Sequence, residues 1–411
     1  MVPKGWEISQ LKDLIEGSIK NGFSPNPADS DTGYWVLGLG ALGEDGIVAS
    51  EIKPVEPQDK VLKNLLTKDD FLVSRSNTPD KVGRSVRFRG EVKNCSYPDL
   101  MMRFRLDQRK ANKFFIEQQL KSSKIRTYFK NCAAGSSSTM VKINKVILEK
   151  TPIPTPSSLQ EQKKIAQILS TWDKAITTTE QLLTNSQQKK TFLMQQLLTG
   201  KKRLMDDSGV RFNSNWRRVK IQEIFTPSTE KAGNSPYRVY SVTKDGLIDQ
   251  AEYFNKTVAS EDTSNYRVIR KGQFIMSGLN FWMGSVDVHN RSEPVKVSPA
   301  YKVFDISDSI DFSFMKHFVR STVFLRILVG SSIVGASVVR RNFSPDTFNS
   351  WVIELPTIEE QQKIDAVLSA ADQEISALQQ KLDALKQEKK ALMQQLLTGK
   401  RRVKIDNKEV A

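Results

Sequence analysis

Three residues in the first half of the chain have a spacing that could support hydrolysis. Asp80 follows a proline, and after an interval of ten residues comes Glu91-Val-Lys93. In nucleases with this pattern two carboxylates hold Mg²⁺ and the lysine supports the attacking water. Such a short pattern arises easily by chance, and the second half has nothing comparable between Asn280 and Val297. A stand-alone Mg²⁺-dependent nuclease is therefore kept as an alternative hypothesis.

Basic side chains crowd the same stretch, and polar and basic residues occur at the matching place in the second half. Arginine can bind both major-groove acceptors of guanine, asparagine can bind adenine, and any basic side chain can hold phosphate. For any single residue, a solvated charge or a scaffold hydrogen bond is an alternative role. We predict a DNA-binding set of Arg75, Asn77, Lys81, Arg84, Arg87, Arg89 and Lys93 in the first half, and Ser277, Asn280, Trp282, His289, Arg291, Arg340 and Arg341 in the second.

The residue inventory argues against several other chemistries. Cys95 and Cys132 are too few for a disulfide framework, and His289 and His317 form no metal-ligand pattern, so neither a disulfide nor zinc is predicted. No Walker lysine motif occurs, and the stretch 26–29 (NPAD) lacks the second proline and the aromatic ring of an adenine methyltransferase motif. We predict no cofactor, and we do not expect the chain to be an enzyme.

Charge and length favour a folded protein whose surface meets a polyanion; a moderately basic protein without a polyanion partner is the alternative. The net charge is +16, from 62 Lys and Arg against 46 Asp and Glu, and the excess is spread along the chain rather than confined to a tail. The 411 residues fit two domains with connecting elements. No apolar run approaches the roughly 18 residues of a membrane span, and no signal peptide is evident. We expect a cytoplasmic protein without a membrane partner.

The nonapeptide LMQQLLTGK occurs twice, at 193–201 and at 392–400. An alignment that places Leu159 on Ile358 continues without a gap to Arg203 and Arg402, and about half of its pairs are identical. In both copies a Ser/Thr-x-x-Glu capping box after a proline predicts a helix start, and a glycine followed by basic residues predicts its end. Two helices of about 40 residues result, each about 60 Å long.

Apolar residues recur in both copies at alternating steps of three and four, as in a coiled coil. Because burying one Leu or Ile is worth about 1.5 to 3 kcal/mol, we predict that the two helices pack on each other; alternatively, each covers its own neighbouring domain. Lys190 and Lys389 share one seam position and either fix the register or lie solvated at an edge. The predicted packing residues are Leu169, Trp172, Ile176, Leu183, Leu193 and Leu197, with Leu368, Ile375, Leu378, Leu382, Leu385, Leu392 and Leu396.

The segments before each helix share an order of signals, although their sequences have diverged. Trp6 matches Trp216, and FLVSRSN (71–77) matches QFIMSGLN (273–280). Both segments mix short β-rich runs with short helical ones, which predicts mixed α/β domains. The predicted organisation is an α+β protein with an internal pseudo-twofold repeat: a first domain (1–156), a long helix (157–200), a linker (201–215), a second domain (216–356), a second long helix (357–399) and a basic C-terminal tail (400–411).

This pattern resembles the specificity (S) subunit of type I restriction-modification enzymes. The resemblance is carried by the helices opened by LQEQKKIAQIL and PTIEEQQKIDAVL and closed by LMQQLLTGK, together with the GW and SNWRR starts of the domains. It implies two target recognition domains separated by an antiparallel coiled coil, each domain reading one half of a bipartite, asymmetric double-stranded DNA target. It also implies two modification (methyltransferase) subunits that use S-adenosylmethionine, and restriction subunits that cut DNA with ATP, as the catalytic partners.

The twin nonapeptide would then mark two equivalent docking ends for two equal partners. Alternatively, the identity only records a recent duplication. A coiled-coil adaptor that binds proteins and no DNA is the other function we keep open. The predicted docking residues are Gln195, Gln196 and Leu198 on the first helix, with Gln394, Gln395 and Leu397 on the second.

Overall fold

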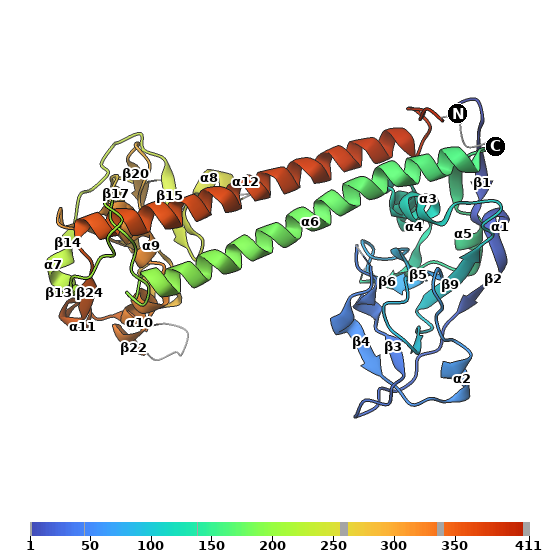
Figure 1. Cartoon of the computed structure of the whole chain (residues 1–411), viewed down its shortest axis with the longest axis horizontal. Coiled ribbons are helices and arrows are strands. Elements are labelled where there is room, and N and C mark those ends of the chain that lie inside the picture. Colours follow the sequence, from blue (N-terminus) through green and yellow to red (C-terminus); the bar gives the residue numbers. More distant parts are fainter. Residues whose placement is uncertain (1, 45, 138, 255–261, 335–340, 406–411) are drawn as a thin grey trace. The chain divides into compact units, whose positions relative to one another are not determined.

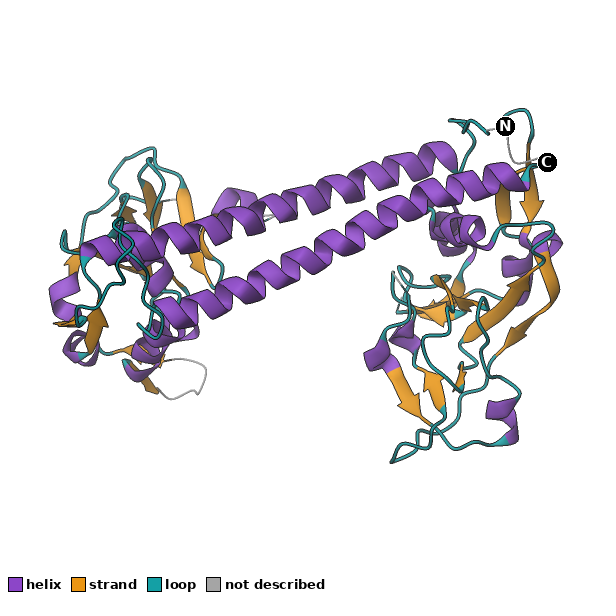
Figure 2. Cartoon of the chain, viewed as in Figure 1, coloured by secondary structure: helices purple, strands orange, loops and turns teal. Residues whose placement is uncertain are grey.

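A computed structural model describes residues 2–44, 46–137, 139–254, 262–334 and 341–405 of the chain (Figure 1). Contacts divide it into two units: unit 1 is Met1–Thr179 with Lys381–Ala411, and unit 2 is Glu180–Gln380. The division cuts through the middle of both long helices, α6 (Leu159–Leu197) and α12 (Ile358–Leu396). Each unit therefore consists of a mixed α/β domain together with one half of each long helix (Figure 2).

Unit 1 is built on a central antiparallel sheet, beside which lie a smaller sheet, a hairpin and short helices. The central sheet has the order β2 (Ile15–Asn21), β9 (Met101–Leu106), β5 (Phe71–Ser74) and β7 (Ser85–Arg87). The remaining strands form the sets β4 (Ile52–Pro54), β3 (Trp35–Leu37) and β8 (Cys95–Ser96); β10 (Ala134–Ser137), β11 (Met140–Lys142) and β6 (Ser76–Asn77); and β1 (Trp6–Gln10) with β12 (Pro152–Pro156). The helices are α1 (Leu11–Leu14), α2 (Asp59–Leu62), α3 (Lys113–Lys121), α4 (Ser123–Cys132) and α5 (Lys145–Glu149), with 3₁₀ turns at 39–41 and 49–51.

Unit 2 repeats this plan in the same chain order. Its central sheet has the order β14 (Phe225–Ser228), β21 (Lys302–Ile306), β18 (Phe274–Met276) and β19 (Val286–Val288). The other sets are β16 (Gly246–Asp249), β15 (Val239–Thr243), β20 (Val295–Val297) and β17 (Arg267–Ile269); β22 (Ser332–Val334) with β23 (Arg341–Phe343); and β13 (Arg217–Lys220) with β24 (Val352–Leu355). The helices are α7 (Ile221–Ile224), α8 (Gln250–Tyr253), α9 (Phe312–Phe318), α10 (Thr322–Gly330) and α11 (Pro345–Ser350), with the 3₁₀ turn η3 (Phe281–Met283).

The pairing registers show that the two units share the same central sheet and the same parallel pair, although the smaller sheets differ in strand number. Phe71 of β5 lies opposite Phe104, and Phe274 of β18 lies opposite Phe304. The smaller sheet contains a parallel pair in both units, β3 with β8 and β15 with β20. The predicted internal repeat and the α+β class are therefore confirmed.

The two long helices pair in opposite directions, and each unit shows this with its own contacts. In unit 1 Lys389, late in α12, forms an ion pair with Asp173, which lies in the first half of α6. In unit 2 Lys190, late in α6, forms one with Asp372 in the first half of α12, and Ser186 donates a hydrogen bond of 2.9 Å to Glu374. The predicted antiparallel pairing is confirmed, and both seam lysines pair with an aspartate of the other helix.

The seam residues of each long helix pack against the other long helix and also against a domain core. Leu169 and Leu396 belong to the main core of unit 1, while Leu197 and Leu368 belong to that of unit 2. The helix ends are thus anchored in domains, and the alternatives of helix pairing and domain covering both apply. Of the predicted seam, Ile176, Leu183 and Leu382 are also buried, and Trp172, Leu193, Ile375, Leu378, Leu385 and Leu392 are partly buried.

A repeated polar anchor closes each unit around the start of its long helix. Glu161 accepts two hydrogen bonds from Arg402, at 2.7 and 2.8 Å, and Glu360 accepts two from Arg203, at 2.6 and 2.7 Å. A tryptophan indole, from Trp6 or Trp216, donates to the same carboxylate. Because bidentate arginine–carboxylate pairs are strong and directional, this anchor gives a structural role to the glutamate near the start and the arginine at the end of each copy, which are identical in the two copies.

Candidate nucleic-acid interface

The basic stretch of unit 1 follows β6, turns, and returns through β7. Lys81 and Lys93 are exposed and form no ion pair within the described residues. Arg75 and Arg84 are half-exposed and donate to the main-chain oxygens of Asp99 and Leu42. These four cations lie on the surface, where they are available to phosphate or base edges.

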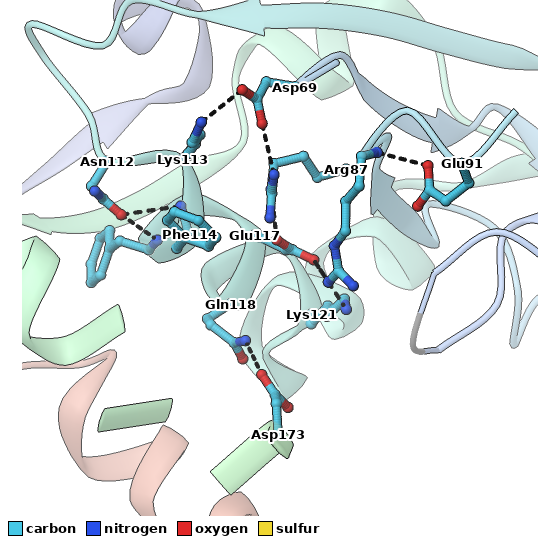
Figure 3. Close-up of polar contacts among 12 residues, drawn as sticks. Asp69, Arg87, Glu91, Asn112, Lys113, Phe114, Glu117, Gln118, Lys121 and Asp173 are labelled. Atoms are coloured by element: carbon cyan, nitrogen blue, oxygen red, sulfur yellow. Dashed lines mark hydrogen bonds and ion pairs between the residues drawn. The ribbon is translucent and has the colours of Figure 1, made fainter. Parts of the chain in front are cut away.

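Two members of the predicted set are internal instead. The side chain of Asn77 is buried and its oxygen accepts the amide of Thr78 at 2.9 Å. Arg87 is only 4% exposed and lies between Asp69 and Glu117, with N–O distances of 2.7 and 2.8 Å (Figure 3). The prediction that Arg87 contacts DNA is therefore wrong, because β7 is buried along its whole length and this side chain pairs with Asp69 and with Glu117 of α3.

Arg87 belongs to a buried ion cluster that also holds Lys113, Lys121 and the half-exposed Arg89 (Figure 3). Burial by itself would raise the pKa of Glu117, but the charges of Lys121 and Arg87 outweigh it and hold this pKa below its usual value. The cluster fixes β7 to α3. Arg89 keeps part of its guanidinium at the surface while donating to Glu117 at 3.0 Å.

The carboxylates of the nuclease pattern have separate local roles. Asp80 accepts a hydrogen bond of 2.6 Å from the Thr78 hydroxyl, which holds the pKa of Asp80 below its usual value. Glu91 accepts the main-chain amide of Arg89 at 2.7 Å. Among the described residues, no group of three or more His, Cys, Asp or Glu side chains could hold a metal ion. The local bonding of Asp80 and Glu91 gives no support to cleavage by this chain.

The fold adds a residue that the sequence reasoning missed. Strand β11 pairs with β6 and places Lys142 opposite Ser76, beside the basic turn. Lys142 and Met140 of this hairpin are exposed. The repeat could have indicated Lys142, because the equivalent hairpin of unit 2 carries the predicted Arg341 on its second strand.

In unit 2 the structure brings two predicted residues into contact. The guanidinium carbon of Arg341 lies 4.3 Å from the centre of the Trp282 ring, and Arg341 donates to the Ser332 hydroxyl at 3.1 Å. Asn280 is exposed directly before this 3₁₀ turn. A guanidinium held over an indole is restricted in its orientation, and its remaining N–H groups suit bidentate binding of a base edge or phosphate.

The remaining predicted residues of unit 2 are placed elsewhere. His289 is 1% exposed, its ring nitrogen lies 2.8 Å from the Glu293 oxygen, and burial lowers its pKa. Ser277 is buried and accepts the amide of Asn280. Their assignment to a DNA surface is wrong, because both satisfy main-chain groups inside the domain. Arg291 is exposed and donates a hydrogen bond to the hydroxyl of Tyr240, which belongs to β15 of the smaller sheet. Arg340 lies outside the described residues.

The predicted docking residues at the helix ends divide in the same way. Leu198 and Leu397 are 2% and 1% exposed because they complete the cores of unit 2 and unit 1. The prediction that these two leucines dock a partner is wrong, because both side chains lie inside a domain core. Gln195, Gln394 and Gln395 are exposed and Gln196 is half-exposed.

Within the described residues, no helix is both long and apolar enough to cross a membrane.

Comparison with known proteins gives consistent matches. Residues 3–188 match the family described as Type I restriction modification DNA specificity domain. A protein of Methanocaldococcus jannaschii, assigned as the specificity subunit of the type I restriction enzyme MjaX, is 24% identical over 425 residues that cover 98% of this chain and 95% of that protein.

Two solved structures share the fold. One chain comes from a study of complex assembly and conformational transition of the type I restriction-modification system; it has a TM-score of 0.57 and 15% identity, and the match covers 98% of this chain and 100% of that one. The crystal structure of a type I S subunit from M. genitalium has a TM-score of 0.56 and 13% identity, with 98% and 97% covered.

Proposed function

We propose that this chain is a specificity subunit of a type I restriction-modification system, as the match of residues 3–188 and the full-length relative indicate, and that each unit reads one half of a bipartite DNA target. The observation that carries the proposal is one scaffold, present twice, that exposes different side chains at equivalent places. Unit 1 presents Arg75, Lys81 and Lys142, whereas unit 2 presents Asn280 and the Arg341–Trp282 pair. Two unlike surfaces on one chain favour an asymmetric, two-part target.

Selection of duplexes from a randomised library by the purified full chain tests this proposal. We expect two short specified blocks with an unread gap between them. Arg341→Ala should relax one block and leave the other unchanged, because a good bidentate contact is worth about 1 to 3 kcal/mol of discrimination. A single continuous block, or equal relaxation of both blocks, would rule out separate reading by the two units.

We propose that the paired helices set the length of the gap. Each is a continuous helix of 39 residues, about 58 Å long at 1.5 Å per residue. Inserting one heptad into each helix, near Thr179 and near Leu378, keeps the seam in register and adds about 10 Å, which corresponds to about three base pairs. Selected targets should therefore keep both blocks and widen the gap. An unchanged gap would exclude the helices as the spacer.

We propose that two modification subunits dock on equivalent faces of the helices, and that methylation and cleavage are carried out by the partner subunits. Along the solvent side of each helix, glutamine recurs at heptad spacing at positions that are identical in the two copies. Exposed neighbours differ, for example Lys189 against Glu388 and Phe192 against Ala391. The repeated glutamines are Gln181, Gln188 and Gln195 on α6, and Gln380, Gln387 and Gln394 on α12, all of them exposed.

The number of bound partners tests this docking face. Gln188→Arg should reduce the co-purified modification subunits from two to one per chain, and adding Gln387→Arg should remove both, since each change places a charge in one of two equal interfaces. The matched control is Gln187→Arg, because Gln187 is an exposed neighbour that the other copy replaces with Lys386. Loss of partners in the control, or their retention in the double variant, would place the interface elsewhere.

A further inference from the structure

We infer that unit 2 carries a separate docking groove for one acidic, apolar segment of a partner protein. The groove has a volume of about 470 Å³ and lies where the end of α6 meets α9, α10 and the β13–β24 pair. Its floor includes Leu198, Phe318 and Val323, and its rim includes Arg218 and Arg326. None of these residues belongs to the DNA-reading set or to the glutamine faces, so the groove is a further surface.

Two tryptophans form fixed walls of this groove. Trp216 packs on Gly200, where an added Cβ would come within 3.3 Å of its ring, and its indole N–H donates to Glu360 at 3.2 Å. Trp351 packs on Gly330, where an added Cβ would come within 2.7 Å of its ring. Trp351 is nevertheless 36% exposed, and the adjacent Val352 is 40% exposed. A rigid aromatic wall that is still exposed is a typical anchor site for a protein partner.

The charged residues that line the groove indicate which kind of segment it can bind. Arg218 and Arg326 are both exposed, and neither forms an ion pair within the described residues. Glu354 is the acidic lining residue and stands opposite Arg218 across the β13–β24 pair. Two unpaired guanidinium groups against one carboxylate favour a segment that brings carboxylates to the rim. The aromatic and aliphatic floor favours large apolar side chains between those carboxylates over a bare phosphate backbone.

Unit 1 does not repeat this surface. The positions equivalent to Arg218 and Arg326 are Ile8 and Thr127, according to the strand register and the helix alignment. The position equivalent to Trp351 is Thr151, whose side chain is buried. Whereas the repeated glutamine faces suit two copies of one partner, this groove provides one site per chain.

Selection from a displayed library of random linear peptides, with the full chain as bait, tests the inference. Counter-selection uses the full chain carrying Arg218→Glu and Arg326→Glu, two exposed positions whose replacement leaves the core intact. We expect enriched peptides that combine carboxylates with large apolar residues. The best peptide, labelled with fluorescein, should bind at one copy per chain and lose about tenfold or more in affinity to the double variant.

Matched measurements decide the interpretation. Arg217→Glu changes the same charge on the neighbouring residue of β13, which is exposed but does not line the groove, and should leave peptide affinity unchanged. A peptide with lysines in place of its carboxylates should prefer the double variant. The inference fails if no acidic apolar peptide is enriched or if Arg217→Glu weakens binding equally. It also fails if the double variant weakens duplex DNA binding as much as Arg341→Ala, because the groove would then hold phosphate.

Discussion

The equivalent strands β7 and β19 bury different residues at the same position. Arg87 of β7 lies opposite Phe71 in unit 1, and Val288 of β19 lies opposite Phe274 in unit 2. Unit 1 surrounds its arginine with Asp69 and Glu117, whereas Val288 of unit 2 belongs to an apolar core that contains a cluster of phenylalanine rings. The ring centres of Phe274 lie 4.7, 5.7 and 5.6 Å from those of Phe225, Phe304 and Phe324. One strand order thus tolerates two kinds of interior, so topology here does not depend on particular core chemistry.

The largest expected effect comes from breaking the ion cluster of unit 1. Glu117→Ala should destabilise this unit by about 3 to 5 kcal/mol, because it leaves Arg87 buried with part of its charge uncompensated. Hydrogen exchange of the α3 amides, compared with those of α9, would localise the loss. The matched control is Lys316→Ala at the equivalent position of unit 2, which is half-exposed and should change stability by less than about 0.5 kcal/mol.

If the cluster provides geometry rather than net stability, an apolar replacement should restore unit 1. The double variant Arg87→Val with Glu117→Leu gives β7 the valine of unit 2, replaces its carboxylate partner with an apolar side chain, and should recover most of the loss. A double variant as unstable as Glu117→Ala would show that the charges are needed for folding of unit 1.

The next effect separates the two reading surfaces. Arg341→Ala should weaken binding of a full two-part duplex by about 1 to 3 kcal/mol, because it removes the cation stacked on Trp282. Lys142→Ala should reduce the DNA affinity by a smaller amount, and this loss of affinity should depend more on the salt concentration, as expected for a phosphate contact. Fluorescence anisotropy at two salt concentrations measures both. Identical losses with identical salt slopes would mean that the two hairpins do not differ in how they contact DNA.

A smaller difference is expected from the aromatic cores. Phe274→Leu should cost about 1 kcal/mol more than Phe71→Leu, because Phe274 loses three ring contacts and Phe71 loses its single stacked contact with Phe104 at 5.1 Å. Both side chains are fully buried, so the area they remove from water is closely matched. Chemical unfolding of the full chain, with exchange rates for each unit, measures the difference. Equal costs would show that packing volume alone matters.

The last comparison concerns pH. His317 of α9 contacts Asp365 and Asp372 of α12, while the equivalent Gln118 of α3 donates to Asp173 at 2.8 Å. Burial lowers the pKa of His317, Lys190 and Lys316 lower it further, and the two aspartates oppose them. Because the unfolded imidazole takes up a proton more readily than the folded one, unit 2 should lose stability as pH falls through the ordinary histidine pKa.

His317→Gln, which copies the residue of unit 1, should reduce this loss between about pH 7.5 and pH 5.5, and the part due to the buried His289 should remain. The readout is the unfolding free energy of each unit across that range. An unchanged slope in the variant would assign the pH dependence to other groups.

The long helices could be predicted because their signals are local and repeated. The capping box at Ser158, the glycine at Gly200 and the heptad pattern each follow from the chemistry of neighbouring residues. Gly200 and Gly399 do have the positive φ values, 69° and 72°, that the predicted helix ends require. The division into two mixed α/β halves followed from the same repeat.

The site residues were harder to assign because exposure is a tertiary property. Arg87 and Lys93 look alike in the sequence, yet one faces α3 inside a cluster of carboxylates and the other faces solvent. His289, Ser277, Leu198 and Leu397 were misassigned for the same reason. Strand pairing also brought Lys142 beside Ser76, which no local pattern could indicate.

Alone, the sequence determined the two long helices, the order of domains and helices and their duplication, because helix caps, heptads and repeats depend on residues close together along the chain. Only the tertiary structure decided which cations are buried and which are free, and which tryptophans become the walls of a groove. Those outcomes depend on side chains from distant segments meeting at one place, where burial is favourable for a charge only when its partner arrives as well.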